Sequence, residues 1–236
     1  DISPLCLGVE ICEDLWAPIP PSSYHSLHGA NIIINLSASN DLAGKTEYRR
    51  DLVKLQSSKC ISAYVYSCAG EDESTTDLVF SGHCMIAENG ILLEEDKIWD
   101  GFIYSDIDLE KLNNERVSLN TFMRKLDKND YKHVSFNLGC SENLTLTRFI
   151  DPRPFVPAKP EARDRRAEDL INMQATGLAQ RMKKINSKKA VLGISGGLDS
   201  TLALLVTLEA FKKLKLPFTN IIAVIMPGFG TSQRTY

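Results

Sequence analysis

A short glycine-rich string, SGGLDS at residues 195–200, constrains the fold of this chain more than any other feature. It lies between two apolar stretches, AVLGI at 190–194 and TLALLV at 201–206, which predict a strand before it and a helix after it. Such a turn directs backbone N–H groups and a helix N-terminus at one point, and that arrangement suits a phosphate anion. The two glycines allow the anion to approach closely, where a Cβ atom would collide. The string therefore predicts an α/β unit that binds a nucleotide.

Composition limits the class of protein. The chain has 236 residues, enough for one large domain or two smaller ones, and its 43% of hydrophobic residues can supply a core. The net charge of −3 gives no support for nucleic-acid binding, and the apolar runs fall far short of the ~20 residues that a membrane span needs. Six cysteines without a CxxC pair argue against a zinc site and favour the reducing cytoplasm.

The first part of the chain, residues 1–150, reads as a mixed sheet that carries helices. An Asn-Gly pair at 89–90 is typical of a hairpin turn between two strands. The polar stretch after residue 108 is helical or irregular. Apolar and β-branched runs predict strands at 5–11, 30–35, 63–68, 82–87 and 102–107, and a helix at 46–60.

A proline-rich stretch at 151–161 predicts a linker, because proline removes hydrogen-bond donors and breaks regular elements. The remaining residues, 162–236, form the nucleotide section, with a helix at 162–186, a strand at 190–194, a helix to about residue 213 and a strand at 221–226. The chain starts almost directly on a core strand and stops soon after the last of these strands. We therefore expect a piece of a larger protein. The predicted apolar side of the first helix consists of Leu170, Ile171, Met173, Leu178, Met182 and Ile185.

The SGGLDS string differs from the common nucleotide loops. It lacks the Lys-Ser/Thr ending of a Walker loop and the GxGxxG pattern of dinucleotide-binding folds. It resembles the SGGxDS loop of the ATP pyrophosphatase (PP-loop) family, whose members cleave ATP between the α and β phosphates and transfer AMP to a substrate oxygen. The resemblance implies that Asp199 holds Mg²⁺. The residues it implies for ATP binding are Gly193, Ile194, Ser195, Gly196, Gly197, Leu198, Asp199 and Ser200.

Cys12 is a second candidate for chemistry. A cysteine at the end of a strand is most often a small buried hydrophobe, and the neighbouring acids Glu13 and Asp14 disfavour a thiolate. The segment around it, GVEICEDLW at 8–16, however, resembles the nucleophile segment of the nitrilase (carbon–nitrogen hydrolase) superfamily, and in particular its branch in the glutamine-dependent NAD⁺ synthetases. The matching segments are GVEICEDLW at 8–16, NLSAS at 35–39, GKTEYRR at 44–50, AYVY at 63–66, GEDESTTDLVF at 70–80, GH at 82–83 and MPGFGTS at 226–232.

The resemblance implies a fold and a set of site residues. The fold is the C-terminal part of a nitrilase-like α-β-β-α sandwich, joined to the start of a Rossmann-like PP-loop domain. Cys12 is the implied nucleophile that attacks the side-chain amide of glutamine. Ser39, Lys45 and Glu13 are implied to bind glutamine, although Lys45 also reads as a solvated surface lysine and Ser39 as a turn residue. The glutamate base and the lysine of nitrilase-type sites precede the cysteine by long stretches, so we expect them upstream of Asp1.

The implied reaction joins the two halves. Ammonia released from L-glutamine amidates deamido-NAD⁺, which ATP with Mg²⁺ has adenylated, and the products are NAD⁺, AMP and pyrophosphate. We expect self-association into a homo-oligomer and no nucleic-acid or membrane partner. Two other hypotheses remain open: a tRNA-thiolating PP-loop enzyme, which would need a basic surface, and a non-catalytic fragment in which Cys12 and the loop are relics.

Overall fold

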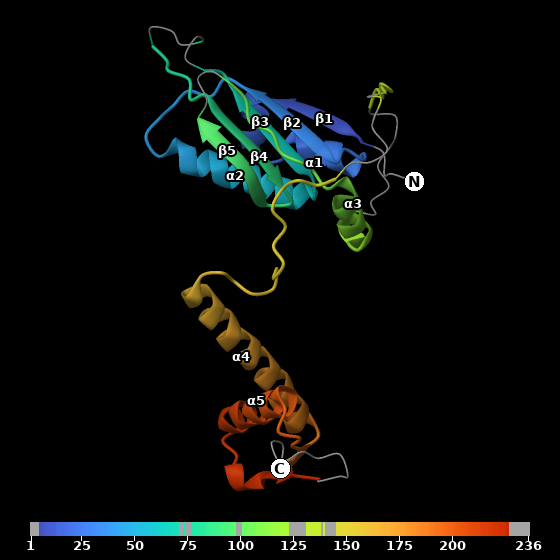
Figure 1. Ribbon diagram of the computed structural model, residues 1–236, viewed down its shortest axis with the longest axis vertical. Coiled ribbons are helices and arrows are strands. Elements are labelled where there is room, and N and C mark those ends of the chain that lie inside the picture. Colours follow the sequence, from blue (N-terminus) through green and yellow to red (C-terminus); the bar gives the residue numbers. More distant parts are fainter. Residues whose placement is uncertain are drawn as a thin grey trace. The chain divides into compact units, whose positions relative to one another are not determined.

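The chain divides into two compact units, Asp1–Phe149 and Ile150–Tyr236, which are described separately. The computed structural model describes residues 5–70, 73, 77–97, 101–122, 131–137, 139 and 145–226 (Figure 1). Parts of the family resemblance, at residues 71, 72, 74–76 and 227–232, lie outside these described residues. The interpretation of the units as a glutaminase-like part, a linker and a synthetase part stays a prediction.

The first unit is built on a mixed sheet with the strand order β1-β2-β3-β4-β5. The first three strands are parallel, and the last two add antiparallel neighbours. Its elements are β1 (Leu7–Ile11), the 3₁₀ turn η1 (Cys12–Trp16), α1 (Pro21–Leu27), β2 (Ile32–Ser37), α2 (Lys45–Cys60), β3 (Ala63–Cys68), β4 (His83–Glu88), β5 (Ile91–Lys97), α3 (Leu109–Val117) and the 3₁₀ turn η3 (Asn120–Phe122).

One face of this sheet forms the core with α1 and α2 (Figure 1). Gly8 on β1 allows α1 to approach, because a Cβ atom there would lie 2.9 Å from the Cβ of His25. The buried members of this core are Leu15, Ala30, Ile33, Val53, Tyr64, Tyr66, Cys68, Met85 and Ala87. On the opposite face the apolar side chains of Leu7, Val9 and Ile11 are 40–64% exposed. Apolar residues on both faces of a strand are typical of a sheet with layers on both sides.

The hairpin predicted at Asn89 and Gly90 is present, but its second strand is β5. The acidic residues of β5 hid its strand character, whereas one of them, Glu95, is bound by Arg50 and His83. The strand predicted at 102–107 is wrong: residues 102–108 have no regular secondary structure. There Asp106 accepts hydrogen bonds from Thr147, so this segment is held by a side chain instead of a strand ladder.

The second unit packs two helices and a short parallel sheet. Its elements are α4 (Pro160–Lys184), β6 (Ala190–Gly193), α5 (Leu198–Leu214), the 3₁₀ turn η5 (Phe218–Asn220) and β7 (Ile221–Val224). β6 pairs in parallel with β7. The helix α4 begins inside the predicted linker, because proline is well suited to the first turn of a helix. Both units have the α/β fold class that the sequence predicts.

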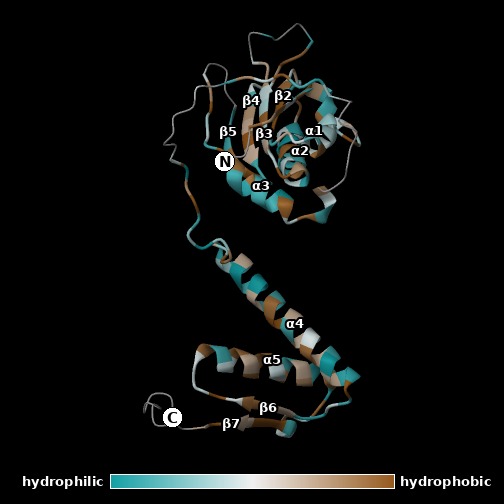
Figure 2. Cartoon of the chain, turned by 90° about the vertical axis from the view of Figure 1, so that its right-hand side faces the viewer, coloured by the Kyte–Doolittle hydropathy of each residue, from teal (hydrophilic) through white to brown (hydrophobic). Residues whose placement is uncertain are grey.

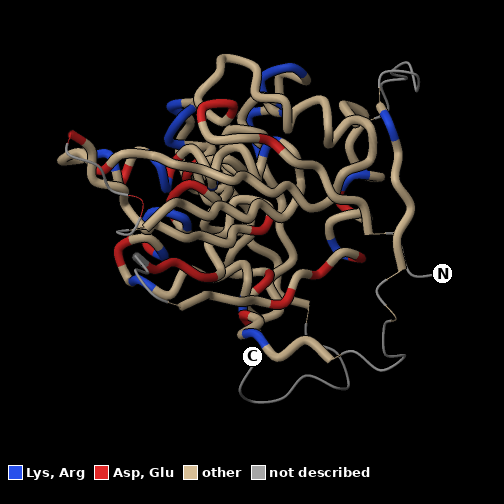
Figure 3. The backbone as a smooth tube through the Cα atoms, turned by 90° about the horizontal axis from the view of Figure 1, so that it is seen from above, with Lys and Arg blue, Asp and Glu red and all other residues tan. Residues whose placement is uncertain are grey.

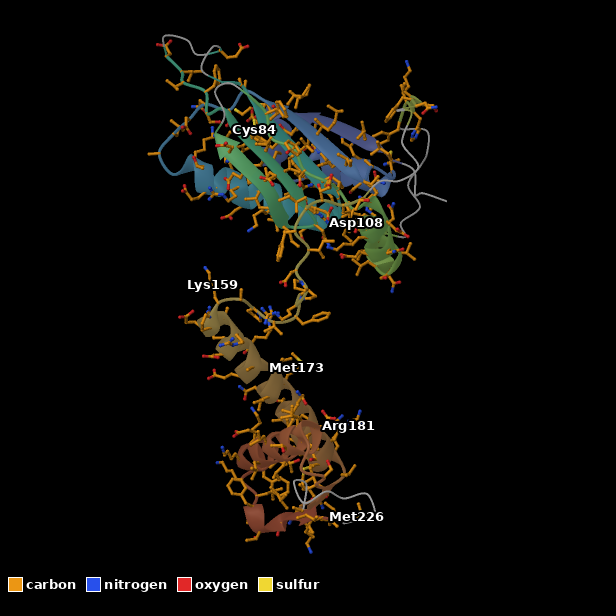
Figure 4. All side chains as sticks on the ribbon, viewed as in Figure 1. Cys84, Asp108, Lys159, Met173, Arg181 and Met226 are labelled. Atoms are coloured by element: carbon orange, nitrogen blue, oxygen red, sulfur yellow. The ribbon has the colours of Figure 1, made fainter. Side chains whose placement is uncertain are left out.

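The predicted apolar side of α4 is only partly used. Ala175, Ala179 and Met182 are buried, and the two alanines pack against α5, whereas Met173 and Ile185 are 69% and 74% exposed. Figure 2 shows hydrophilic and hydrophobic residues alternating along α4, and Figure 4 labels Met173 on this helix. The small residues were missed because the helix pattern was judged from large apolar side chains. They permit the close approach of the two helices.

Basic and acidic residues are nearly balanced in number, which gives the small net charge of −3. Figure 3 shows Lys and Arg interspersed with Asp and Glu along the backbone. Within the described ranges, no helix has the length and the apolar character that a crossing of the membrane requires.

Candidate active site and phosphate loop

Cys12 lies where β1 ends and the turn η1 begins. Its φ of +50° is in the left-handed region, whereas Ile11 before it is extended, with a φ of −124°. The chain therefore leaves the sheet sharply at Cys12, as it does at nucleophiles that are presented on a strand-to-helix turn. The carboxylate of Asp14 accepts a hydrogen bond from the Ile11 N–H at 2.8 Å and closes the turn. This acid thus has a structural part in holding Cys12.

A buried polar chain lies behind Cys12. The side-chain Oδ1 of Asn35 accepts from the Cys12 N–H at 3.2 Å, and its Nδ2 donates to the Cys12 carbonyl at 3.4 Å and to the Tyr64 hydroxyl at 3.1 Å. Tyr64 donates in turn to the carboxylate of Glu10, which also accepts from the backbone N–H of Ser22 at 2.7 Å. Burial, reinforced by the Glu10 charge, raises the pKa of Tyr64 far above its ordinary value, so its hydroxyl stays protonated.

The Cys12 side of the sheet carries a surface pocket of about 540 Å³. The pocket lies at the carboxyl ends of β1, β2 and β3, which is where ligands bind in open α/β sheets. The residues that line it are Ile11, Cys12, Leu36, Ser37, Ala38, Ser67, Cys68, Ala69, Gly70 and Glu73. Cys12 is thus half-buried beside a hollow that could admit a small amide.

The residues predicted to bind glutamine are not among those that line this pocket. Ser39 is buried just behind it, where its N–H contacts the Sγ of Cys68 at 3.3 Å. Lys45 begins α2, donates to Asn40 Oδ1 at 2.6 Å and lies 5.3 Å from the centre of the Trp16 ring. The structure therefore brings Lys45 together with Trp16. Glu13 is exposed on η1.

A second buried network supports the segment that carries Ser39. The guanidinium of Arg49, which is fully buried, donates to Ser39 Oγ at 3.2 Å, to the Asn40 carbonyl at 3.4 Å and to His83 Nδ1 at 3.1 Å. Because arginine only donates, Nδ1 of His83 accepts and its proton sits on Nε2, which faces Glu95 Oε1 at 2.8 Å. The network ends at Arg50, which binds both Glu95 oxygens at 2.7 and 2.8 Å.

The glycine loop of the second unit lies between β6 and α5. Gly196 has a φ of +77°, and the first residues of α5 follow directly, with Leu198 89% exposed. Ser195 and Ser200 hold the loop, because Ser200 Oγ accepts from the Ser195 N–H at 3.3 Å and donates to the Gly197 carbonyl at 3.1 Å. The loop therefore presents its hydroxyls and amides at the N-terminus of a 17-residue helix. Such a site suits an anion.

The loop offers one carboxylate for a metal. Asp199 is exposed in the first turn of α5. In the described part of the chain, no three His, Cys, Asp or Glu side chains gather into a metal site. Magnesium at nucleotide sites usually keeps several waters and binds substrate phosphates together with one or two carboxylates.

Comparisons with known proteins give matches to the last part of this chain and to its whole length. Residues 170–236 match the family model described as NAD synthase. The whole chain is 40% identical to the glutamine-dependent NAD(+) synthetase of Mycobacterium leprae, and 97% of it is 31% identical to that of Thermotoga maritima. Over its whole length the chain is therefore a homologue of the glutamine-dependent NAD(+) synthetases. It spans 36% and 38% of the length of these two relatives.

Among solved structures, the glutamine-dependent NAD⁺ synthetase from Acinetobacter baumannii in complex with adenosine diphosphate aligns with 97% of this chain and 35% of its own, at 19% identity and a TM-score of 0.41. A TM-score below 0.5 does not establish a shared fold. The likeness to the synthetases therefore rests on the sequence relatives.

The sequence motifs predicted Cys12 and the glycine loop as site residues, but they did not predict the buried residues that support them. Asn35, Glu10 and Arg49 are polar or charged and almost fully buried. Their signal in the sequence is a polar residue at an inward position of an apolar strand, as Glu10 is in LGVEI and Asn35 in IIINLS. That signal marks a buried polar group, but it does not name its partner.

Proposed function

We propose that this chain contributes the nucleophile and the phosphate loop of an enzyme that makes NAD⁺ from deamido-NAD⁺, ATP and glutamine. The carrying observation is that Cys12, on a left-handed turn beside a pocket, and the SGGLDS loop occur in one chain that is a homologue of the NAD(+) synthetases. Neither feature alone selects this reaction. Together they supply an ammonia source and a site for adenylation.

In the first half-reaction, the Cys12 sulfur attacks the amide carbon of glutamine, and the amide nitrogen leaves as ammonia. Water then hydrolyses the thioester to glutamate. Glu10 is not the base for these steps, because its carboxylate is 2% exposed and is bound by Ser22 and Tyr64. Ser39 and Lys45 remain proposed contacts for the backbone groups of glutamine, and the exposed Glu13 remains a weaker one.

In the second half-reaction, the nicotinate carboxylate of deamido-NAD⁺ attacks the α-phosphorus of ATP, and pyrophosphate leaves. The loop amides, Ser195 and Ser200 would hold that departing anion at the start of α5. Mg²⁺ would enter with ATP, with Asp199 as one ligand. Ammonia then displaces AMP and forms the amide of NAD⁺.

We also propose a cellular compartment and an oligomeric state for the enzyme. All five cysteines in the described ranges are free thiols, which favours a reducing compartment, so we place the enzyme in the cytoplasm. We expect it to act as a homo-oligomer, without a nucleic-acid or membrane partner.

The substitution Cys12→Ala tests the proposal in the protein as its gene encodes it. We expect glutamine-dependent formation of NAD⁺ to fall by at least about 1,000-fold, because the nucleophile is absent. With ammonium chloride as the nitrogen donor, the rate should stay within about twofold of the wild type. The measurement is the production of NAD⁺ with each donor, with amide-¹⁵N glutamine to trace the nitrogen. Retention of glutamine-dependent synthesis by the variant would show that Cys12 is not the nucleophile.

A further inference from the structure

Cys12 is held in a backbone conformation that most residues avoid. The left-handed region costs an L-residue about 1–2 kcal/mol, and such a conformation persists only where the surrounding structure enforces it. The sheet cannot enforce it alone, because the β1–β2 ladder ends with the pair Ile11 and Leu36. Something beyond the ladder must hold the peptide groups of Cys12.

The side chain of Asn35 meets both peptide groups. It is fully buried on β2, opposite Glu10 in the parallel register, and reaches one step past the end of the ladder. There it accepts from the Cys12 N–H and donates to the Cys12 carbonyl. We propose that Asn35 is a positioning residue that clamps the backbone of Cys12 and so aims the thiol into the pocket. This role deepens the proposed function and rests on it for its catalytic consequence.

The amide of Asn35 can adopt only one orientation. Tyr64 gives its proton to the Glu10 carboxylate, so the Tyr64 oxygen faces Asn35 as an acceptor and requires the Nδ2 end there. The Cys12 N–H, which is a donor, requires the Oδ1 end. Both requirements agree. Glu10 is fixed in turn by the backbone of Ser22, so the position of Cys12 is tied to the start of α1.

Asn31 supplies a matched control. It is also buried, at 2% exposure, and its Oδ1 accepts from a cysteine N–H, that of Cys6, at 2.9 Å. Asn31 lies just before β2 and binds Cys6, which precedes β1, whereas Cys12 follows the other end of β1. Asn35→Leu and Asn31→Leu therefore replace the same kind of buried amide with a side chain that branches in the same way, and only the first touches the nucleophile.

The test uses the protein as its gene encodes it, with two readouts. For Asn35→Leu we expect the kcat of glutamine hydrolysis to fall about 100-fold with KM changed by less than about threefold, because a displacement of about 1 Å at a reacting group has an effect of that size. Ammonium-dependent synthesis should be unchanged. Hydrogen exchange of the Cys12 amide should become at least about tenfold faster. Asn31→Leu should leave kcat and this exchange rate near the wild-type values.

Tyr64→Phe is a second variant that keeps the ring in the core. It removes the group that orients Asn35, and we expect kcat to fall about tenfold, again with little change in KM. Equal losses in Asn35→Leu and Asn31→Leu, or unchanged exchange of the Cys12 amide in Asn35→Leu, would overturn the clamp. If the wild-type protein does not hydrolyse glutamine, the proposed function fails, and the exchange measurement still decides whether the clamp exists.

Discussion

The two sites of this chain are held in opposite ways. Besides the local Asp14 bond that closes its turn, Cys12 is held by the side chain of Asn35, which lies 23 positions away in the sequence. The glycine loop is fixed by its own members, since the hydrogen bonds of Ser195, Gly197 and Ser200 span five positions or fewer. The residues behind Cys12 are buried, whereas the glycine loop is exposed.

The difference follows from the two chemistries. A thiol that attacks carbon must be aimed, so its backbone is tied to a rigid, buried frame. A loop that binds phosphate must stay exposed to the anion, so this loop is held by short-range hydrogen bonds between its own residues. We therefore expect variants in the first site to act through long-range packing and variants in the loop to act locally.

The largest effect is expected at Arg49, whose guanidinium joins Ser39, Asn40 and His83. Arg49→Met removes a fully buried donor group, and the three groups that accept from it would then face the apolar methionine side chain. We expect the free energy of unfolding to fall by about 2–3 kcal/mol, the usual effect of leaving buried polar groups unpaired. Denaturant unfolding monitored by circular dichroism measures this change.

Arg50 is the control for Arg49, because it is the next residue and its side chain is 33% exposed. Its ion pair with Glu95 is close to solvent, so Arg50→Met should lower the free energy of unfolding by less than about 1 kcal/mol. Equal losses of unfolding free energy in the two variants would contradict the view that the buried Arg49 stabilises the protein more than Arg50 does.

Substitutions at the two glycines of the loop should distinguish effects on the backbone conformation from effects on the approach of ATP. Gly196 has a φ of +77°, so Gly196→Ala should lower the stability of the second unit by about 1–2 kcal/mol. Gly197 has an ordinary φ of −86°, and a Cβ there would lie 3.4 Å from Ser195 Oγ, so Gly197→Ala should fold normally. Both should weaken ATP binding at least about tenfold, because a methyl group would stand where the phosphate approaches.

Thermal unfolding without nucleotide and calorimetric titration with ATP distinguish these effects. A loss of stability in Gly197→Ala as large as that in Gly196→Ala would show that the loop is strained throughout and not at one residue.

The sequence indicated both Cys12 and the loop, but the contacts that hold them could be predicted for the loop alone. The loop could be predicted because its contacts lie within its own six residues, and β1 to β4 could be predicted from apolar and β-branched runs. The pairing of Arg49 with His83 joins residues 34 positions apart, which no local pattern encodes. Strand β5 was missed because its carboxylates interrupt the apolar pattern. Glu95 is in fact bound by the Arg50 cation of α2 and by the Nε2–H of the neutral His83 on β4.

The smallest effect is expected at Glu95, the outer member of the Arg49 network. Burial raises the pKa of Glu95, but the hydrogen bonds from Arg50 and His83 outweigh it and leave the pKa below the ordinary value. The unfolded chain therefore binds a proton first, near pH 4.3, and the stabilisation by Glu95 is complete above about that pH and lost as the pH falls through the folded-state pKa. Melting temperatures of the wild type and Glu95→Gln should differ at pH 6 and converge toward pH 3. A difference that persists at pH 3 would mean that Glu95 stabilises the sheet by packing, and the charge would then play no part in holding the Arg49 network.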